Sequence, residues 1–259
     1  MKIEPRWLRL TEESNALDYL EKASFFIKQT ESDNVAWKWV IISLHGALYG
    51  FAICACKGTN PERVIDFKRR HKTIQKLEKL PKSIQKPGFP NDVKLKYNSQ
   101  LKRLEFIGSM PDNVRRKLLK LSNDNNYKLA INKLYSDSHQ LISFNRALDR
   151  CQNPNFMRMT IMSKELQLTD EQKDSIDILK KEFRNNIEHY IPKAWSIEIH
   201  GMPIIAIDVL NVIRFLAIET GNYIQLRQTQ IRRLKSLVFQ SKKFLRNSTL
   251  YKEASEKSL

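Results

Sequence analysis

One short segment combines residue types that could catalyse the cleavage of RNA. It contains Arg184, Asn185 and His189, and Pro192 follows three residues later. Histidine titrates near neutral pH and can act as a general acid or base, whereas arginine stays charged and binds phosphate oxygens through paired hydrogen bonds. Together they could promote attack of a ribose 2′-hydroxyl on the adjacent phosphate, with Asn185 orienting His189 or the phosphate. Such a reaction needs no metal ion.

An ideal helix would not bring Arg184 and His189 together. Five residues turn by about 500°, so the two side chains would point about 140° apart and lie about 7.5 Å apart along the axis. Either the last turn before Pro192 is distorted, or two chains contribute residues to one cleft. A purely structural interpretation also stands: Arg184 pairs with Glu188 one turn later, worth roughly 0.3–0.5 kcal/mol, and His189 closes the helix end.

The positive charge of the chain is concentrated in two segments. The 259 residues carry a formal net charge of +17, and residues 57–120 and 220–246 together exceed that total, so the remaining residues are close to neutral. Clustered Lys and Arg attract polyanions, and nucleic acid is the commonest one inside cells, although a charge run can also be a solvated face. We predict contacts with nucleic acid from these residues: Lys68, Arg69, Arg70, Lys72, Arg115, Arg116, Arg232, Arg233 and Lys235.

Other kinds of site find little support in the sequence. There is no HExxH, no Cys/His cluster, no phosphate-binding GxxxxGK[ST], no GxGxxG and no GxSxG, so we expect neither a metal nor another cofactor. The three cysteines, Cys54, Cys56 and Cys151, cannot form a paired disulfide framework, which indicates a reducing, cytoplasmic location. We expect Cys54, Cys56 and His45 to be core residues of an apolar helix.

The pattern of apolar residues predicts an all-α protein. Thr11 caps a first helix, Val35 to Cys56 is an apolar helix, a capping box at Thr169 and Gln172 begins the helix that carries Arg184, and Pro203 to Leu216 is a second core helix. We also expect helices within the basic segment, including residues 93–106. A basic amphipathic helix follows from Ile224 to Leu245, and the last dozen residues should fray.

The apolar helix raises one further possibility. Residues 39–56 form a run of 18 without Asp, Glu, Lys or Arg, which just reaches the length of a membrane span. His45, Ser43, Gly46 and Gly50 interrupt it, and lysines at both ends provide no asymmetry to orient a span. We therefore favour a buried core helix and no membrane association, with a membrane-associated protein as the alternative.

The segment Phe183-Arg184-Asn185-Asn186-Ile187-Glu188-His189-Tyr190 resembles the motif of the HEPN superfamily, which is Arg, a polar residue, a short spacer and His. The resemblance implies a HEPN-like helical bundle and a metal-independent endoribonuclease. It also implies a homodimer in which Arg184 stabilises the phosphate, His189 is acid or base, and Asn185 orients. A toxin or defence setting would add a neutralising protein partner. Some toxin members carry Tyr two residues after the His, where this chain has Ile191.

This resemblance leads to a division of the chain. Residues 1–56 and 121–219 form the HEPN-like core, residues 57–120 a basic helical insertion, and residues 220–259 a basic C-terminal helix with a frayed tail. A second interpretation keeps the fold without the chemistry: a non-catalytic helical protein that binds nucleic acid or acts as an adaptor. The two differ in whether Arg184 and His189 converge on an open cationic groove.

Overall fold

The computed structural model describes residues 7–66, 94–98, 103–107, 140–180, 187 and 196–256. The chain divides into two compact units. The first, which we call the body, comprises Met1–Val64 and Ile142–Leu259, and the second comprises Ile65–Leu141. We describe each unit by itself.

The body is helical, which confirms the all-α prediction for this part of the chain. Its elements are α1 (Glu12–Gln29), α2 (Ala36–Lys57), the 3-10 turn η1 (Pro61–Val64), α6 (Phe144–Gln152), α7 (Pro154–Met157), α8 (Asp170–Ile178), α10 (Met202–Arg214), the π-helical turn η3 (Phe215–Glu219), α11 (Gln228–Asn247) and α12 (Thr249–Glu256). The predicted caps are present: Thr11 with Ser14 begins α1, and Thr169 with Gln172 begins α8.

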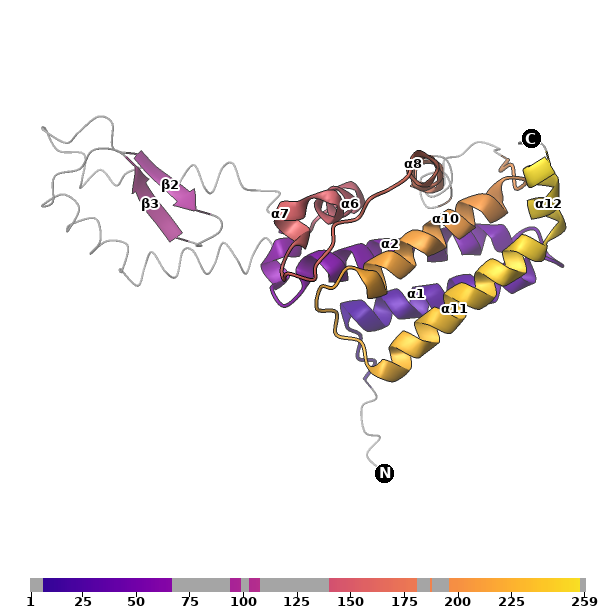
Figure 1. The fold of residues 1–259 in the computed structure, drawn as a ribbon, viewed down its shortest axis with the longest axis horizontal. Coiled ribbons are helices and arrows are strands. Elements are labelled where there is room, and N and C mark those ends of the chain that lie inside the picture. The colour runs from indigo at the N-terminus through magenta and orange to yellow at the C-terminus, as the bar shows by residue number, and fades with distance from the viewer. Residues whose placement is uncertain are drawn as a thin grey trace, which may run out of the picture. The chain divides into compact units, whose positions relative to one another are not determined.

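Helix α2 forms the centre of the body, and α1, α6 and α10 pack against it (Figure 1). It is long and apolar enough to cross a membrane by length and composition alone. Val40, Leu44, Leu48 and Phe51 are nevertheless fully buried against these neighbours. Within this fold α2 is a core helix, as expected from its interrupted apolar run.

The second unit contains β-structure where the sequence predicted a helix. Strand β2 (Lys94–Asn98) pairs antiparallel with β3 (Arg103–Ile107), so the predicted helix over residues 93–106 is wrong. The register aligns Leu95 with Phe106 and Tyr97 with Leu104, which matches an apolar residue at every second position. A second short pairing joins β1 (Ile65–Asp66) to β4 (Gln140–Leu141).

The boundaries of the inserted unit also differ from the predicted 57–120. Residues 57–64 belong to the body, because the Arg63 guanidinium donates to the backbone carbonyls of Cys56 and Phe156. The chain returns to the body at Ile142, whose N–H donates to the Val64 carbonyl at 2.9 Å. The inserted unit is therefore Ile65–Leu141.

The C-terminal part is an element of the body and not a separate attachment. Leu234, Val238 and Leu245 of α11 are buried in the core, and α1 and α10 both pack against this helix. The predicted frayed tail is wrong for residues 249–256, which form α12 and bury Ala254. The segment is mostly polar and buries one residue, Ala254, so its apolar pattern is too weak to predict a helix.

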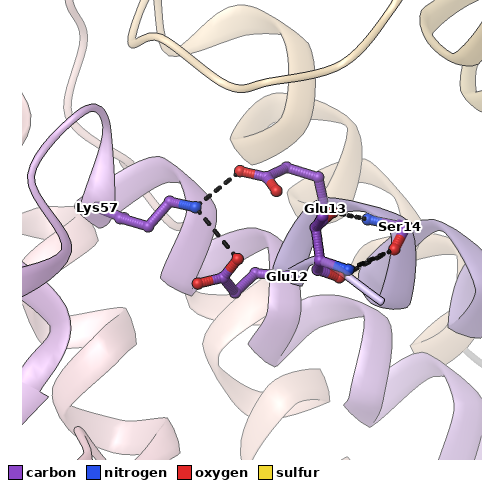
Figure 2. Close-up of polar contacts among 5 residues, drawn as sticks. Glu12, Glu13, Ser14 and Lys57 are labelled. Carbon is purple, nitrogen blue, oxygen red and sulfur yellow. Dashed lines mark hydrogen bonds and ion pairs between the residues drawn. The ribbon is translucent and has the colours of Figure 1, made fainter. Parts of the chain in front are cut away.

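An ion pair joins the start of α1 to the end of α2 (Figure 2). The Lys57 ammonium lies 2.8 Å from Glu13 Oε1 and 3.4 Å from Glu12 Oε2, and the side chains of Lys57 and Glu13 are only 13% and 4% exposed. Burial alone would raise the pKa of Glu13, but the hydrogen bond and charge of Lys57, together with further hydrogen bonds to the carboxylate, outweigh the burial, so the pKa is lowered. The same contact raises the pKa of Lys57 against its own desolvation.

We predict that Lys57→Met destabilises the protein by roughly 1–3 kcal/mol at pH 7, because Glu13 stays buried without its partner. The loss should be smaller than the roughly 3–5 kcal/mol that breaking a fully buried pair costs, because this pair is partly exposed. A depressed carboxyl pKa stabilises the fold above its ordinary value of 4.5. The difference from wild type should therefore shrink as pH falls through and below that value. Urea unfolding at several pH values measures it, with the exposed Lys28→Met as the control. A difference that stays constant down to pH 3 would contradict the ion pair.

The close packing of α1 on α2 depends on glycine. A Cβ at Gly50 would lie 2.7 Å from the Ala16 Cβ and 3.1 Å from the Ala16 Cα, whereas a Cβ at Gly46 would meet the ring of Tyr19. The backbone of Ala16 cannot yield, but Tyr19 is 36% exposed and its ring can turn towards solvent. Only Gly50 therefore fixes the distance between the two helices.

Gly50→Ala should destabilise the body by about 1–3 kcal/mol through overpacking. Gly46→Ala should cost much less, because ring movement and a gain of roughly 0.5–1 kcal/mol in helix propensity offset the contact. Both variants are compared with wild type by urea unfolding followed by circular dichroism. Equal stability of the two variants would contradict the assigned packing.

Candidate nucleic-acid interface

The predicted catalytic residues Arg184, Asn185 and His189 lie outside the residues that the structure describes. Ile187, between them in sequence, is helical and 4% exposed in the body core. Helix α8 leads towards this segment and begins at its predicted capping box. The geometry of the three catalytic candidates therefore stays a prediction.

The predicted nucleic-acid contacts divide into two groups. Six of them lie outside the described residues: Lys68, Arg69, Arg70, Lys72, Arg115 and Arg116. The other three are on α11 and exposed, but they differ in direction. Arg233 Nε lies 2.7 Å from Glu21 Oε1 of α1, so its charge is compensated there. Arg232 and Lys235 form no ion pair within the described part of the chain.

Lys235 lines a groove between α10 and α11, which we call the cationic groove. Its volume is about 460 Å³, and its walls carry Arg214 from α10 and Lys235, Lys242, Lys243 and Arg246 from α11. Val238, Phe239 and Asn247 complete the lining. None of these residues is acidic. Figure 1 shows the two helices side by side across the body.

The phase of α11 explains how these residues meet. At 100° per residue, Lys235, Phe239, Lys242 and Arg246 fall within an arc of about 60°, and Lys243 extends it to about 100°. Arg232 lies on the same arc one turn before Lys235. The neighbouring arc, centred roughly 110–120° away, carries the buried residues Leu234, Val238 and Leu245, and Val238 lies at the border where the core meets the groove. The cations are therefore gathered on one face because the other face is needed by the core.

The centre of the cationic groove is a partly buried lysine. Lys242 donates a hydrogen bond from Nζ to Asn211 Oδ1 of α10. Its pKa is lowered, first by burial and then by the like charges of Arg246 and Arg214. Arg214 has one acidic contact, at 2.9 Å between its Nε and Glu219 Oε1, but both side chains are about half exposed. The positive charge of the groove is thus largely uncompensated.

Two other concave regions among the described residues differ in charge. One contains Arg158 and Glu165, joined by two hydrogen bonds at 3.1 and 2.9 Å. The other contains Asp18, Glu21 and Arg233, so acids and a cation meet there as well. Charges of both signs reduce the attraction for a polyanion. Of these three regions, the cationic groove is the one whose lining has no acid.

Sequence reasoning missed Arg214, Phe239 and Lys242 as functional candidates. Phe239 is 69% exposed, and it is the aromatic side chain in the lining of the cationic groove. The sequence contained a signal for Phe239: on a helical projection it falls among the cations of α11, and a core residue is not expected on that side of an amphipathic helix. Arg214 carried no such signal, because its position depends on the packing of α10 against α11.

Histidine and acidic groups are placed without metal-binding geometry in the described part of the chain. No group of three or more His, Cys, Asp or Glu side chains there could hold a metal ion. His45 is 7% exposed and stacks on Phe144 with 4.5 Å between ring centroids, as expected for a core histidine.

The three cysteines are fully buried, as predicted for Cys54 and Cys56. Burial raises the pKa of Cys54 to about 12. Cys56 and Cys151 contact each other, with 3.3 Å between their Sγ atoms. This hydrogen bond lowers the pKa of Cys56 despite burial, and together with burial it raises the pKa of Cys151. Buried thiols in such surroundings are chemically inert.

We therefore predict that none of the three thiols reacts with a disulfide reagent in the folded protein, and that all three react in urea. Reaction under native conditions should be limited by unfolding and slow down with added stability. Spectrophotometric thiol titration measures both states. Rapid native labelling of one equivalent would contradict the burial.

The chain was compared with protein-family models, with curated proteins and with solved structures, and none of them matches it.

Proposed function

We propose that this protein binds RNA and cleaves it as a metal-independent endoribonuclease of the HEPN type. The observation that carries the binding part is the cationic groove, whose five positive side chains face one concave surface with no acid in its lining. Binding would release counterions from the RNA backbone and so depend strongly on salt. The helical body is compatible with the proposed HEPN-like bundle.

The cleavage part rests on the residues Arg184, Asn185 and His189. Arg184 would hold the phosphate and its developing charge, and His189 would transfer a proton to or from the reacting oxygens. Asn185 would orient His189. The 2′-hydroxyl attacks the adjacent phosphorus, the bond to the 5′-oxygen breaks, and the products are a 2′,3′-cyclic phosphate and a 5′-hydroxyl. Two chains in a homodimer would bring the motifs together.

The proposed setting is the cytoplasm, where three free cysteines remain reduced. A toxin or defence role would further require a neutralising protein partner. The second candidate function is a non-catalytic RNA-binding or adaptor protein. The same cationic groove supports it, because attraction of a phosphate backbone does not require chemistry.

Cleavage of a labelled single-stranded RNA in EDTA separates these functions. Arg184→Ala and His189→Ala should each reduce the rate by about 10²–10⁴, because each removes a group that acts in the transition state. His200→Gln is the control, since this histidine lies on the body beside Glu253. Asn185→Ala should lose less activity.

The chemistry of the products gives a second check. Mass spectrometry should find the cyclic phosphate, and a substrate with a single 2′-deoxyribose at the cleavage site should remain intact. Equal rates for wild type and His189→Ala would eliminate the proposed catalysis. RNA binding without cleavage by either protein would favour the adaptor.

A further inference from the structure

The arrangement of the cationic groove distinguishes among possible polyanions. The cations line a hollow and do not form a flat face, and Phe239 of α11 is exposed among them. A flat anionic surface would not reach into such a hollow. An exposed aromatic ring gives a phosphate no hydrogen bond or opposite charge, but a nucleobase can stack on it.

The length of the groove fits several nucleotides. Lys235 and Arg246 are eleven residues apart on α11, which corresponds to about 16 Å. Stacked nucleotides rise by about 3.4 Å each along a strand, so this length covers roughly four or five of them. The groove therefore suits a short stretch of backbone, with Arg214 on the opposite wall.

The state of Lys242 points to an anionic occupant. Its ammonium is partly desolvated and crowded by Arg246 and Arg214, and both effects lower its pKa. Within the described residues, Lys235, Lys243 and Arg246 have no acidic partner. A phosphate placed among these cations would relieve their mutual repulsion and gain charge-assisted hydrogen bonds.

Paired bases could not reach Phe239. In a duplex the base faces are stacked and covered, whereas a single strand can turn a base out onto an aromatic ring. We infer that the groove between α10 and α11 binds single-stranded RNA, with backbone phosphates against Arg214, Lys242 and Arg246 and one base stacked on Phe239. The choice of RNA over DNA rests on the proposed function, because the described groove residues do not identify a contact for the 2′-hydroxyl.

The test measures binding of a fluorescent oligouridine of about 12 nucleotides to the full chain by anisotropy, over a range of salt concentrations. Phe239→Ala should weaken binding by about 5- to 150-fold, because stacking contributes roughly 1–3 kcal/mol per base. It should leave the salt dependence unchanged. Arg246→Gln should weaken binding and reduce the slope of log affinity against log salt by about 0.7.

Two variants on α1 serve as matched controls. Phe25 is also an exposed phenylalanine, at 55%, and Lys28 is an exposed cation on the same helix. Phe25→Ala and Lys28→Gln should bind like wild type. Thermal unfolding of all variants checks that the fold is retained, which their surface positions favour.

Three results would overturn the inference: unchanged affinity of Phe239→Ala, equal affinity for the single strand and its matched duplex, or equal losses for the groove variants and their α1 controls. Polyglutamate competing as well as oligouridine would instead assign the groove to an acidic peptide. The binding assay is performed in the His189→Ala background as well as in wild type. If groove variants lose binding but wild type cleaves no RNA, the proposed nuclease activity is refuted and the groove inference stands. If wild type cleaves RNA and the groove variants bind it equally well, the groove inference is refuted and the nuclease proposal stands.

Discussion

The architecture of the body depends on burying α2 on all sides. Thirteen of the seventeen residues from Val40 to Cys56 are buried, so no single neighbour can cover them. At roughly 25 cal/mol per Å² of apolar surface, this burial is a dominant favourable contribution to folding. Helices α1, α6 and α10 therefore all pack against α2. The ion pair of Lys57 with Glu13 joins the end of α2 to the beginning of α1.

This central packing also positions the cationic groove. α10 lies against α2 through its apolar residues, and α11 lies against both α1 and α10. Leu234, Val238 and Leu245 hold α11 in one rotational orientation. In this orientation Lys235, Phe239 and Arg246 line the groove together with Arg214. The shape of the groove is thus set by the packing of the core. Its charge comes from residues that lie outside the core.

The sequence predicted the elements whose signals are local. The caps at Thr11 and Thr169 and the apolar stretches of α2 and α10 are local patterns, and the structure has helices at all four places. The pairing of β2 with β3 was missed because residues 93–106 were predicted as one helix, although Leu95, Tyr97, Leu104 and Phe106 alternate with period two. Helix α12 was missed because one buried alanine is too weak a signal.

For the candidate site, too, the sequence predicts local features but not contacts between helices. Arg232, Arg233 and Lys235 were chosen because they are close together in sequence, yet each step along a helix turns by about 100°, so Arg233 and Lys235 point about 160° apart. Arg233 consequently reaches Glu21 while Lys235 reaches the groove. Arg214 is contributed by another helix, and only the tertiary packing of α10 against α11 could reveal it. Arg184 and His189 remain predictions from their spacing alone.

The exit and re-entry points of the inserted unit meet within the body. Ile142 N–H bonds to the Val64 carbonyl, the Tyr49 hydroxyl bonds to the Ile142 carbonyl, and Arg150 donates to the Arg63 carbonyl. A polypeptide whose two strands leave a scaffold side by side can be lengthened or shortened there without moving the scaffold, because the closure entropy of a longer loop grows only slowly. Such a junction lets evolution exchange one accessory module for another while the helical scaffold keeps its shape.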